Sequence, residues 1–145
     1  MTDAIDLLQT KNAGITGVGT APALSNYPTT GNIKALTKAV VLTWLRQATL
    51  DRNGVVQTSV YDMDVYVAQA GTDTWKADKI ACQTLWKRFL TAYNLQGNDC
   101  WLQNEPAVRL LQGSLIMTGF QNVIFAPDGE PFHGFRATVT VSEHP

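Results

Sequence analysis

The C-terminal third of the chain, residues 113–143, constrains the fold more than any other stretch. Residues 135–141 alternate strictly between apolar and polar side chains, and a period of two is typical of a strand that buries one face. Two apolar runs and the turn sequence APDG at 126–129 precede this strand, which predicts a β-hairpin. We therefore expect a paired C-terminal strand whose buried side chains are Phe135, Ala137, Val139 and Val141.

An amphipathic helix is predicted over residues 75–93. Asp73 or Thr74 can cap its start, and Asn94 with Gly97 would end it. Apolar side chains recur along this segment at a spacing of three to four residues, which places them on one helical face. The residues expected to face a sheet are Ile80, Ala81, Leu85, Phe89 and Ala92.

The first half of the chain supplies a short helix and two further strands. The helix begins near Thr2 and ends near 12–14, and a stretch rich in Gly, Thr and Pro follows at about 12–32 as an extended loop or arm. Residues 39–45 and 55–69 are strand candidates, and the turn between them contains Asn-Gly.

The strand at 55–69 has two unlike faces. One face carries Tyr61, Met63, Val65 and Val67, and the other carries Asp62, Asp64 and Tyr66. Upstream of these residues, Val56, Thr58 and Val60 fall on the opposite parity, which indicates either a bulge near Val60 or an edge hairpin.

These elements predict an α+β fold. The expected architecture is a two-layer sandwich, in which a mostly antiparallel sheet of four to five strands carries the main helix on one face, beside a short N-terminal helix. A chain of 145 residues fits a single domain spanning 1–145. A sheet with so few strands has free edges, which invite pairing with another subunit.

Charge is the informative part of the composition. Charged residues make up 16% of the chain, against about 25% in a typical soluble domain. Interface cores are depleted of charge, so the deficit favours a subunit covered by its neighbours over a secreted binding domain. The net charge of −1 argues against tight nucleic-acid binding, and no apolar run is long enough to span a membrane. We expect Cys82 and Cys100 to be buried thiols, although a bridge between them stays open.

Few residues suggest catalysis. Asp62 and Asp64 could hold a hard cation or act as acid and base, but the spacing supplies no third ligand and no nucleophile. His133, near Glu130, could be a general base, yet no nucleophile motif accompanies it. A solvated or interface strand face is the better explanation of the two acids, and a turn residue at the hairpin tip is the better explanation of His133. We expect no enzyme activity, no metal and no cofactor.

The order of elements resembles a known family. A helix and a Gly/Pro/Thr-rich stretch precede a strand pair ending in VYDMDVYVAQAGTD, an amphipathic helix WKADKIACQTLWKRFL, and a hairpin closing in FHGFRATVTV. This arrangement resembles the tail terminator proteins of long-tailed bacteriophages, also called tail completion or head–tail joining proteins.

The resemblance implies a structural virion subunit of the tail or neck, assembled in the host cytoplasm. Such a protein forms a homohexameric ring at the head-proximal end of the tail, stops polymerisation of the tail-tube protein and joins the head connector or neck protein. DNA would only pass through its lumen, and no membrane is involved. An acidic lumen would let DNA slide, and the candidate lumen-facing acids are Asp62, Asp64 and Asp73.

Aromatic and loop residues are the candidate contacts between subunits. Bulky aromatic side chains are enriched at interfaces, and the candidates are Tyr27, Pro28, Trp75, Trp86, Phe132 and His133. Three alternatives stay open: another neck or connector subunit of the same particle, a small-molecule-binding α+β domain, and a hydrolase that uses Asp62, Asp64 and His133.

Overall fold

The computed structural model describes residues 4–19, 38–51, 53–69, 75–94, 97–105, 107–118, 124–125 and 129–144. The helical elements are α1 (Ala4–Ala13), α3 (Trp75–Ala92) and the short 3-10 helix η1 (Gly97–Cys100). The strands are β1 (Val40–Leu50), β2 (Gln57–Gln69), β3 (Trp101–Asn104), β4 (Ala107–Leu110), β5 (Ile116–Thr118), β6 (Ile124–Phe125) and β7 (Pro131–Glu143).

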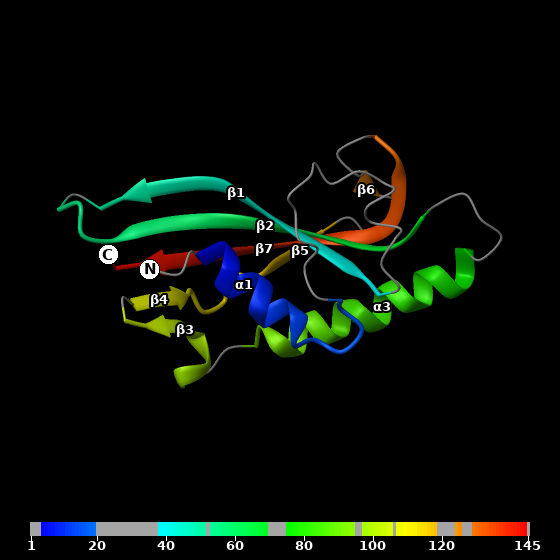
Figure 1. The fold of residues 1–145 in the computed structure, drawn as a ribbon, viewed down its shortest axis with the longest axis horizontal. Coiled ribbons are helices and arrows are strands. Elements are labelled where there is room, and N and C mark those ends of the chain that lie inside the picture. Colours follow the sequence, from blue (N-terminus) through cyan, green and yellow to red (C-terminus); the bar gives the residue numbers. More distant parts are fainter. Residues whose placement is uncertain are drawn as a thin grey trace.

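The long C-terminal strand β7 organises the sheet (Figure 1). The strand order is β1-β2-β7-β4-β3, and every one of these pairings is antiparallel. One edge of β7 pairs with β2 along almost its whole length. The other edge is shared in turn by β4, β5 and β6, which pair with residues 141–143, 136–138 and 131–132.

The sheet therefore has seven strands within the described residues, and the expected four to five is wrong. The α+β class and the mostly antiparallel pairing are confirmed. The undercount has a physical cause: β3 to β6 hold two to four residues each. Segments this short carry too little alternation to be recognised. Three of them, β4, β5 and β6, pair with an edge of β7, and β3 pairs with β4.

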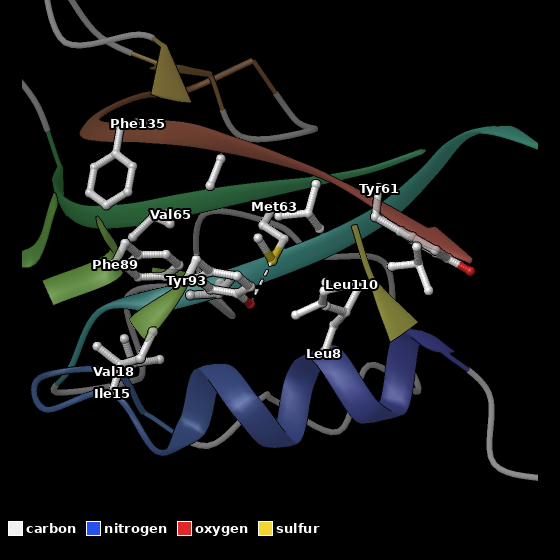
Figure 2. Close-up of a cluster of buried hydrophobic side chains, with 14 of the residues drawn as sticks. Leu8, Ile15, Val18, Tyr61, Met63, Val65, Phe89, Tyr93, Leu110 and Phe135 are labelled. Atoms are coloured by element: carbon white, nitrogen blue, oxygen red, sulfur yellow. Dashed lines mark hydrogen bonds between the residues drawn. The ribbon is translucent and has the colours of Figure 1, made fainter. Parts of the chain in front are cut away.

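Both helices pack on one face of the sheet, which we call the helix-covered face. The alternating side chains of β7 point into it as predicted, and Phe135, Ala137, Val139 and Val141 are buried. Figure 2 shows Leu8 of α1 and Phe89 of α3 reaching toward these strands. The Phe89 ring meets the Phe135 ring edge-on at a centroid distance of 5.4 Å. Burial of this apolar surface is the main stabilising term of the fold.

A buried polar contact ties the two helices to the sheet. The Tyr93 hydroxyl donates to Asn12 Oδ1 at 2.5 Å, and Asn12 Nδ2 lies 3.1 Å from Met63 Sδ. Asn12 is 1% exposed, so its amide needs these partners. Burial raises the pKa of Tyr93 well above its usual range, despite the hydrogen bond from its hydroxyl to Asn12.

The buried stripe of α3 differs in part from the prediction. Leu85 and Phe89 are buried as expected, but Ile80 is 53% exposed and Ala81 is also exposed. Cys82 takes their place in the stripe and is 3% exposed. Residues 82, 85 and 89 lie at helical spacing, and a small thiol packs there as an apolar group. Cys82 and Cys100 are both buried, and no disulfide joins them.

The hairpin of β1 and β2 is longer than predicted. The expected strand at 39–45 continues to Leu50, because a bulge at Arg46 absorbs one residue and the pairing resumes at Gln47. The irregularity lies opposite Tyr61 and Val60, as predicted, but the extra residue is on β1. The turn of this hairpin lies at one end of the molecule, at the left of Figure 1. Of the predicted loop at 12–32, residues 12–19 are described, and Val18 bridges to Ala39.

Candidate functional site

The face of the sheet opposite the helices, here called the outer face, carries a network of ion pairs. Asp62 accepts two hydrogen bonds from Arg46, at 3.0 and 2.7 Å, and one from the Thr138 hydroxyl at 2.7 Å. Asp64 accepts from Arg136 Nε at 2.6 Å and from its Nη2 at 3.3 Å. The three strands β1, β2 and β7 thus meet through side chains as well as through backbone pairing.

The network supplies both carboxylates with hydrogen bonds. Burial alone would raise the pKa of Asp62, but hydrogen bonds from Arg46 and Thr138 and the charge of Arg136 outweigh it, so the pKa lies below its usual value. The hydrogen bond to Asp64 raises the pKa of Arg136. Two acids and two arginines face one another, so this part of the outer face is close to neutral.

An open hollow of about 400 Å³ lies over these ion pairs. Trp44, Tyr66 and Phe125 contribute aromatic side chains to its wall, beside the charged groups. Next to it a small apolar cluster is formed by Val40, Leu42, Tyr66 and Phe132, with Ile124 packed against it. The Tyr66 hydroxyl donates to the backbone oxygen of Phe125 at 3.3 Å.

A glycine allows β6 to lie close to this apolar cluster. A Cβ at Gly134 would collide with the backbone oxygen of Val65 and come within 3.0 Å of Ile124 Cδ1. Glycine is therefore required where β7 approaches β2 and β6 most closely.

The three residues of the hydrolase hypothesis are not brought together. Asp62 and Asp64 lie on the outer face, whereas alternation along β7 places His133 on the helix-covered side, opposite Ala68. His133 is 3% exposed and lies within a strand, so its assignment to a hairpin tip is wrong. The oxygens of both carboxylates already accept from arginines. On the outer face the two carboxylates therefore link neighbouring strands.

The residues predicted to lie at an interface or at the lumen differ in whether the structure describes them and in how exposed they are. Tyr27, Pro28 and Asp73 lie outside the described residues, and the side chain of Trp75, the first residue of α3, does too. Trp86 is half-buried against the main core. Phe132 and His133 are 2% and 3% exposed, so both side chains are covered by their own chain.

Arg46 and Arg136 are the functional residues that sequence reasoning missed. The acids at 62 and 64 suggested an acidic stripe, because residues 51–73 contain four acids and one arginine. The neutralising groups come from β1 and β7, which are distant in sequence. Arg136 was visible as the charged member of an alternating strand, but only the register of β2 with β7 places it opposite Asp64.

The second candidate surface is the hairpin arm, which we define as residues 44–57. Its first part is exposed throughout, in contrast to residues 40–43 of the same strand, which are buried. The exposed apolar side chains include Leu45 (50%), Leu50 (66%) and Val55 (54%). The tip is ordered by Asp51, whose Oδ1 accepts from the amide of Val55 at 2.8 Å.

The outer edge of β1 has no partner strand among the residues that the structure describes. Natural edge strands are usually protected by lysine, proline, a β-bulge or an inward-turned charge, and β1 has a bulge at Arg46. Residues 40–50 contain no lysine or proline. Their one charge, on Arg46, is engaged by Asp62. The arm therefore combines an open backbone edge with exposed apolar side chains.

Comparison with protein-family models, with curated proteins and with solved structures finds no match to this chain. In the described ranges, none of the helices has the length and apolar character needed to cross a membrane. The same ranges contain no group of three His, Cys, Asp or Glu side chains placed to hold a metal ion.

Proposed function

We propose that this protein is a structural subunit of a phage tail. It forms a homohexameric ring at the head-proximal end of the tail tube, stops polymerisation of the tube, and joins the tail to the head connector. The residues quoted for the resemblance to tail terminator proteins suggest this role. The single structural observation that supports it is the hairpin arm, a surface suited to contact with another protein chain.

The arm suits assembly for two physical reasons. An unpaired strand edge presents amide and carbonyl groups that another chain can pair with. Exposed Leu45, Leu50 and Val55 add apolar area that gains free energy when it leaves water. In a monomer neither feature adds stability, whereas in an assembled subunit both the strand edge and the apolar side chains can contribute binding free energy.

A ring requires contacts between two different surfaces of each subunit. A head-to-tail contact repeated around an axis closes into a ring, whereas a contact of the arm with itself would close at two copies. The two edges of this sheet differ greatly, since β1 has eleven residues and β3 has four. Because the two edges differ, a contact between the β1 edge of one subunit and a different surface of the next is favoured, and a ring is built from such head-to-tail contacts. Another neck subunit of the same particle would use the arm in the same way.

The test is the mass of the purified full-length chain in solution. Size-exclusion chromatography with light scattering should give a species of about 95 kDa, six copies of the 15.9 kDa chain. Added to polymerising tail-tube protein, the chain should shorten the tubes seen by electron microscopy. A chain that stays monomeric at high concentration and leaves tube length unchanged would contradict the proposal and favour a small-molecule-binding domain.

A matched pair of variants locates the contact. Leu45→Arg places a charge on the exposed arm and should reduce the assembly to monomers. Ile80→Arg makes the same kind of change on α3, where the side chain is 53% exposed, and should leave the assembly intact. If Leu45→Arg forms the same assembly as the wild type, the arm is not the contact between subunits.

A further inference from the structure

A groove with a basic wall lies between the C-terminal end of α1 and the C-terminal half of α3. Its volume is about 510 Å³, within the range of protein binding sites. Three cationic side chains line it, namely Lys11, Lys87 and Arg88, and none of the other described residues of its lining carries a carboxylate. Ile15 and Ala92 supply apolar surface beside them. The groove is separate from the outer face and from the hairpin arm.

The local sequence positions these cations. Lys87 and Arg88 precede Thr91 by one helical turn on α3, so all three reach the groove. The chain after α1 folds back beneath them through Gly17, whose φ of 95° favours glycine. A Cβ at Gly17 would lie 3.0 Å from Arg88 Nη1. The glycine therefore leaves room for the guanidinium beside the loop.

Two of the three cations are held in place without being neutralised. Arg88 Nη1 donates to the backbone oxygen of Thr16 at 2.9 Å, and Lys11 Nζ lies 5.3 Å from the centre of the Tyr93 ring. Lys87 is exposed. In the described part of the chain, none of the three forms an ion pair. The positive charge of the groove is thus ordered and available, which lowers the cost of binding an anion.

We propose that this groove binds a short acidic segment of a partner protein, rich in Asp or Glu. Carboxylates complement the three cations, and Arg88 in particular can engage a carboxylate through its remaining donors. Ile15 and Ala92 can meet an apolar side chain of the same segment. A single open groove on a chain with a net charge of −1 suits a peptide better than nucleic acid, which binds along extended basic tracks. The inference does not depend on the proposed ring.

The test uses the full-length protein and a fluorescein-labelled peptide of eight residues that alternates glutamate and leucine. Fluorescence anisotropy should show saturable binding that weakens as salt is added. Lys87→Gln should weaken binding about two- to fivefold, the effect of losing one exposed ion pair. Lys76→Gln on the first turn of α3 is the matched control. Its side chain is exposed and lies outside the groove, so binding should be unchanged.

Two further measurements make the outcome decisive. Amide NMR shifts caused by the peptide should centre on Gly14, Thr16 and Thr91, and a version with lysine in place of glutamate should cause none. Equal weakening in Lys76→Gln and Lys87→Gln would overturn the proposal, because it would show a diffuse attraction to the whole helix. Tighter binding of a twelve-nucleotide single-stranded DNA than of the peptide would overturn it too, in favour of a nucleic-acid site.

Discussion

The two faces of the sheet are stabilised by different interactions. On the helix-covered face, the side chains from β2 and β7 that meet α1 and α3 are nearly all apolar and buried. On the outer face, four charged groups form the network around Asp62 and Asp64, and apolar side chains gather in a smaller cluster around Tyr66 and Phe132. The same strands thus supply a hydrophobic core on one side, and on the other side a network of partly exposed ion pairs whose charges balance.

This difference indicates which face stabilises the fold and which face could contact other molecules. Burial of apolar side chains is non-directional and large, whereas partly exposed ion pairs contribute little stability but fix geometry. The helix-covered face therefore stabilises the chain. The outer face aligns β1, β2 and β7, and it keeps the charge of that surface near zero. The predictions below test this division, beginning with the largest effect.

Truncation of Phe89 should have the largest effect on the helix-covered face. Phe89 is fully buried and its ring meets Phe135 edge-on. We expect Phe89→Ala to lower the free energy of unfolding by about 3–5 kcal/mol, because apolar burial is lost and a cavity is left. Chemical denaturation followed by circular dichroism measures this value. A loss below about 1 kcal/mol would mean that α3 packs by a different face.

Removal of Arg136 tests the network on the outer face. Asp64 is mostly buried, and Arg136 provides its hydrogen bonds at 2.6 and 3.3 Å. Arg136→Ala should cost about 1–2 kcal/mol, between the values for exposed and buried ion pairs. The additional change Asp64→Asn should recover part of this loss, because no charge is then left unpaired. Equal destabilisation by the single and the double variant would show that the pair does not act as a unit.

The pH dependence of stability follows from Asp62. Its pKa in the folded chain lies below the ordinary value, since hydrogen bonds from Arg46 and Thr138 and the charge of Arg136 outweigh burial. A lowered pKa stabilises the folded state above the unfolded pKa of about 4. That contribution is lost as the pH falls from about 4 through the folded pKa. Unfolding measured by denaturant from pH 7 to pH 2.5 should show the loss.

A variant isolates this contribution. Asp62→Asn removes the titrating group, so the decline in stability below pH 4 should become shallower than in the wild type. Asp51 also has a lowered pKa, chiefly through the amide of Val55, and it provides the comparison. Asp51→Asn should change only the part of the loss of stability at low pH that comes from the hairpin turn. If Asp62→Asn and the wild type decline in parallel, the network does not stabilise the ionised carboxylate.

The sequence predicted the long elements well, because their patterns span many residues. The boundaries of α3 and the buried set of β7 agree with the spacing of apolar side chains. The predicted pairing of the C-terminal strand with the apolar runs before it is confirmed by β5 and β6, although these hold only three and two residues. The short strands β3 and β4 were not predicted, since a segment of four residues becomes a strand only when a neighbour offers an edge. The length of β1 was missed because the bulge at Arg46 interrupts its pairing with β2.

The candidate site could be predicted only in part. The face of Asp62 and Asp64 followed from alternation alone, since both acids lie opposite Tyr61 and Met63 as expected. Their arginine partners depend on the register of three strands, and one residue of slip would place Arg136 on the other face. The groove between α1 and α3 depends on how the two helices pack, which no local pattern specifies.

Truncation of Phe125 should have the smallest effect and completes the comparison. Phe125 lies at the hollow on the outer face and is 63% exposed, so Phe125→Ala removes the same side chain as Phe89→Ala from a position that buries little of it. We expect a change within about 0.5 kcal/mol, as for most surface substitutions. The hydrogen bond from Tyr66 is retained, because it goes to the backbone oxygen of Phe125. A loss close to that of Phe89→Ala would show that the two faces stabilise the chain equally. A small loss would leave the side chain of Phe125 without a role in folding, and therefore available for contact with other molecules.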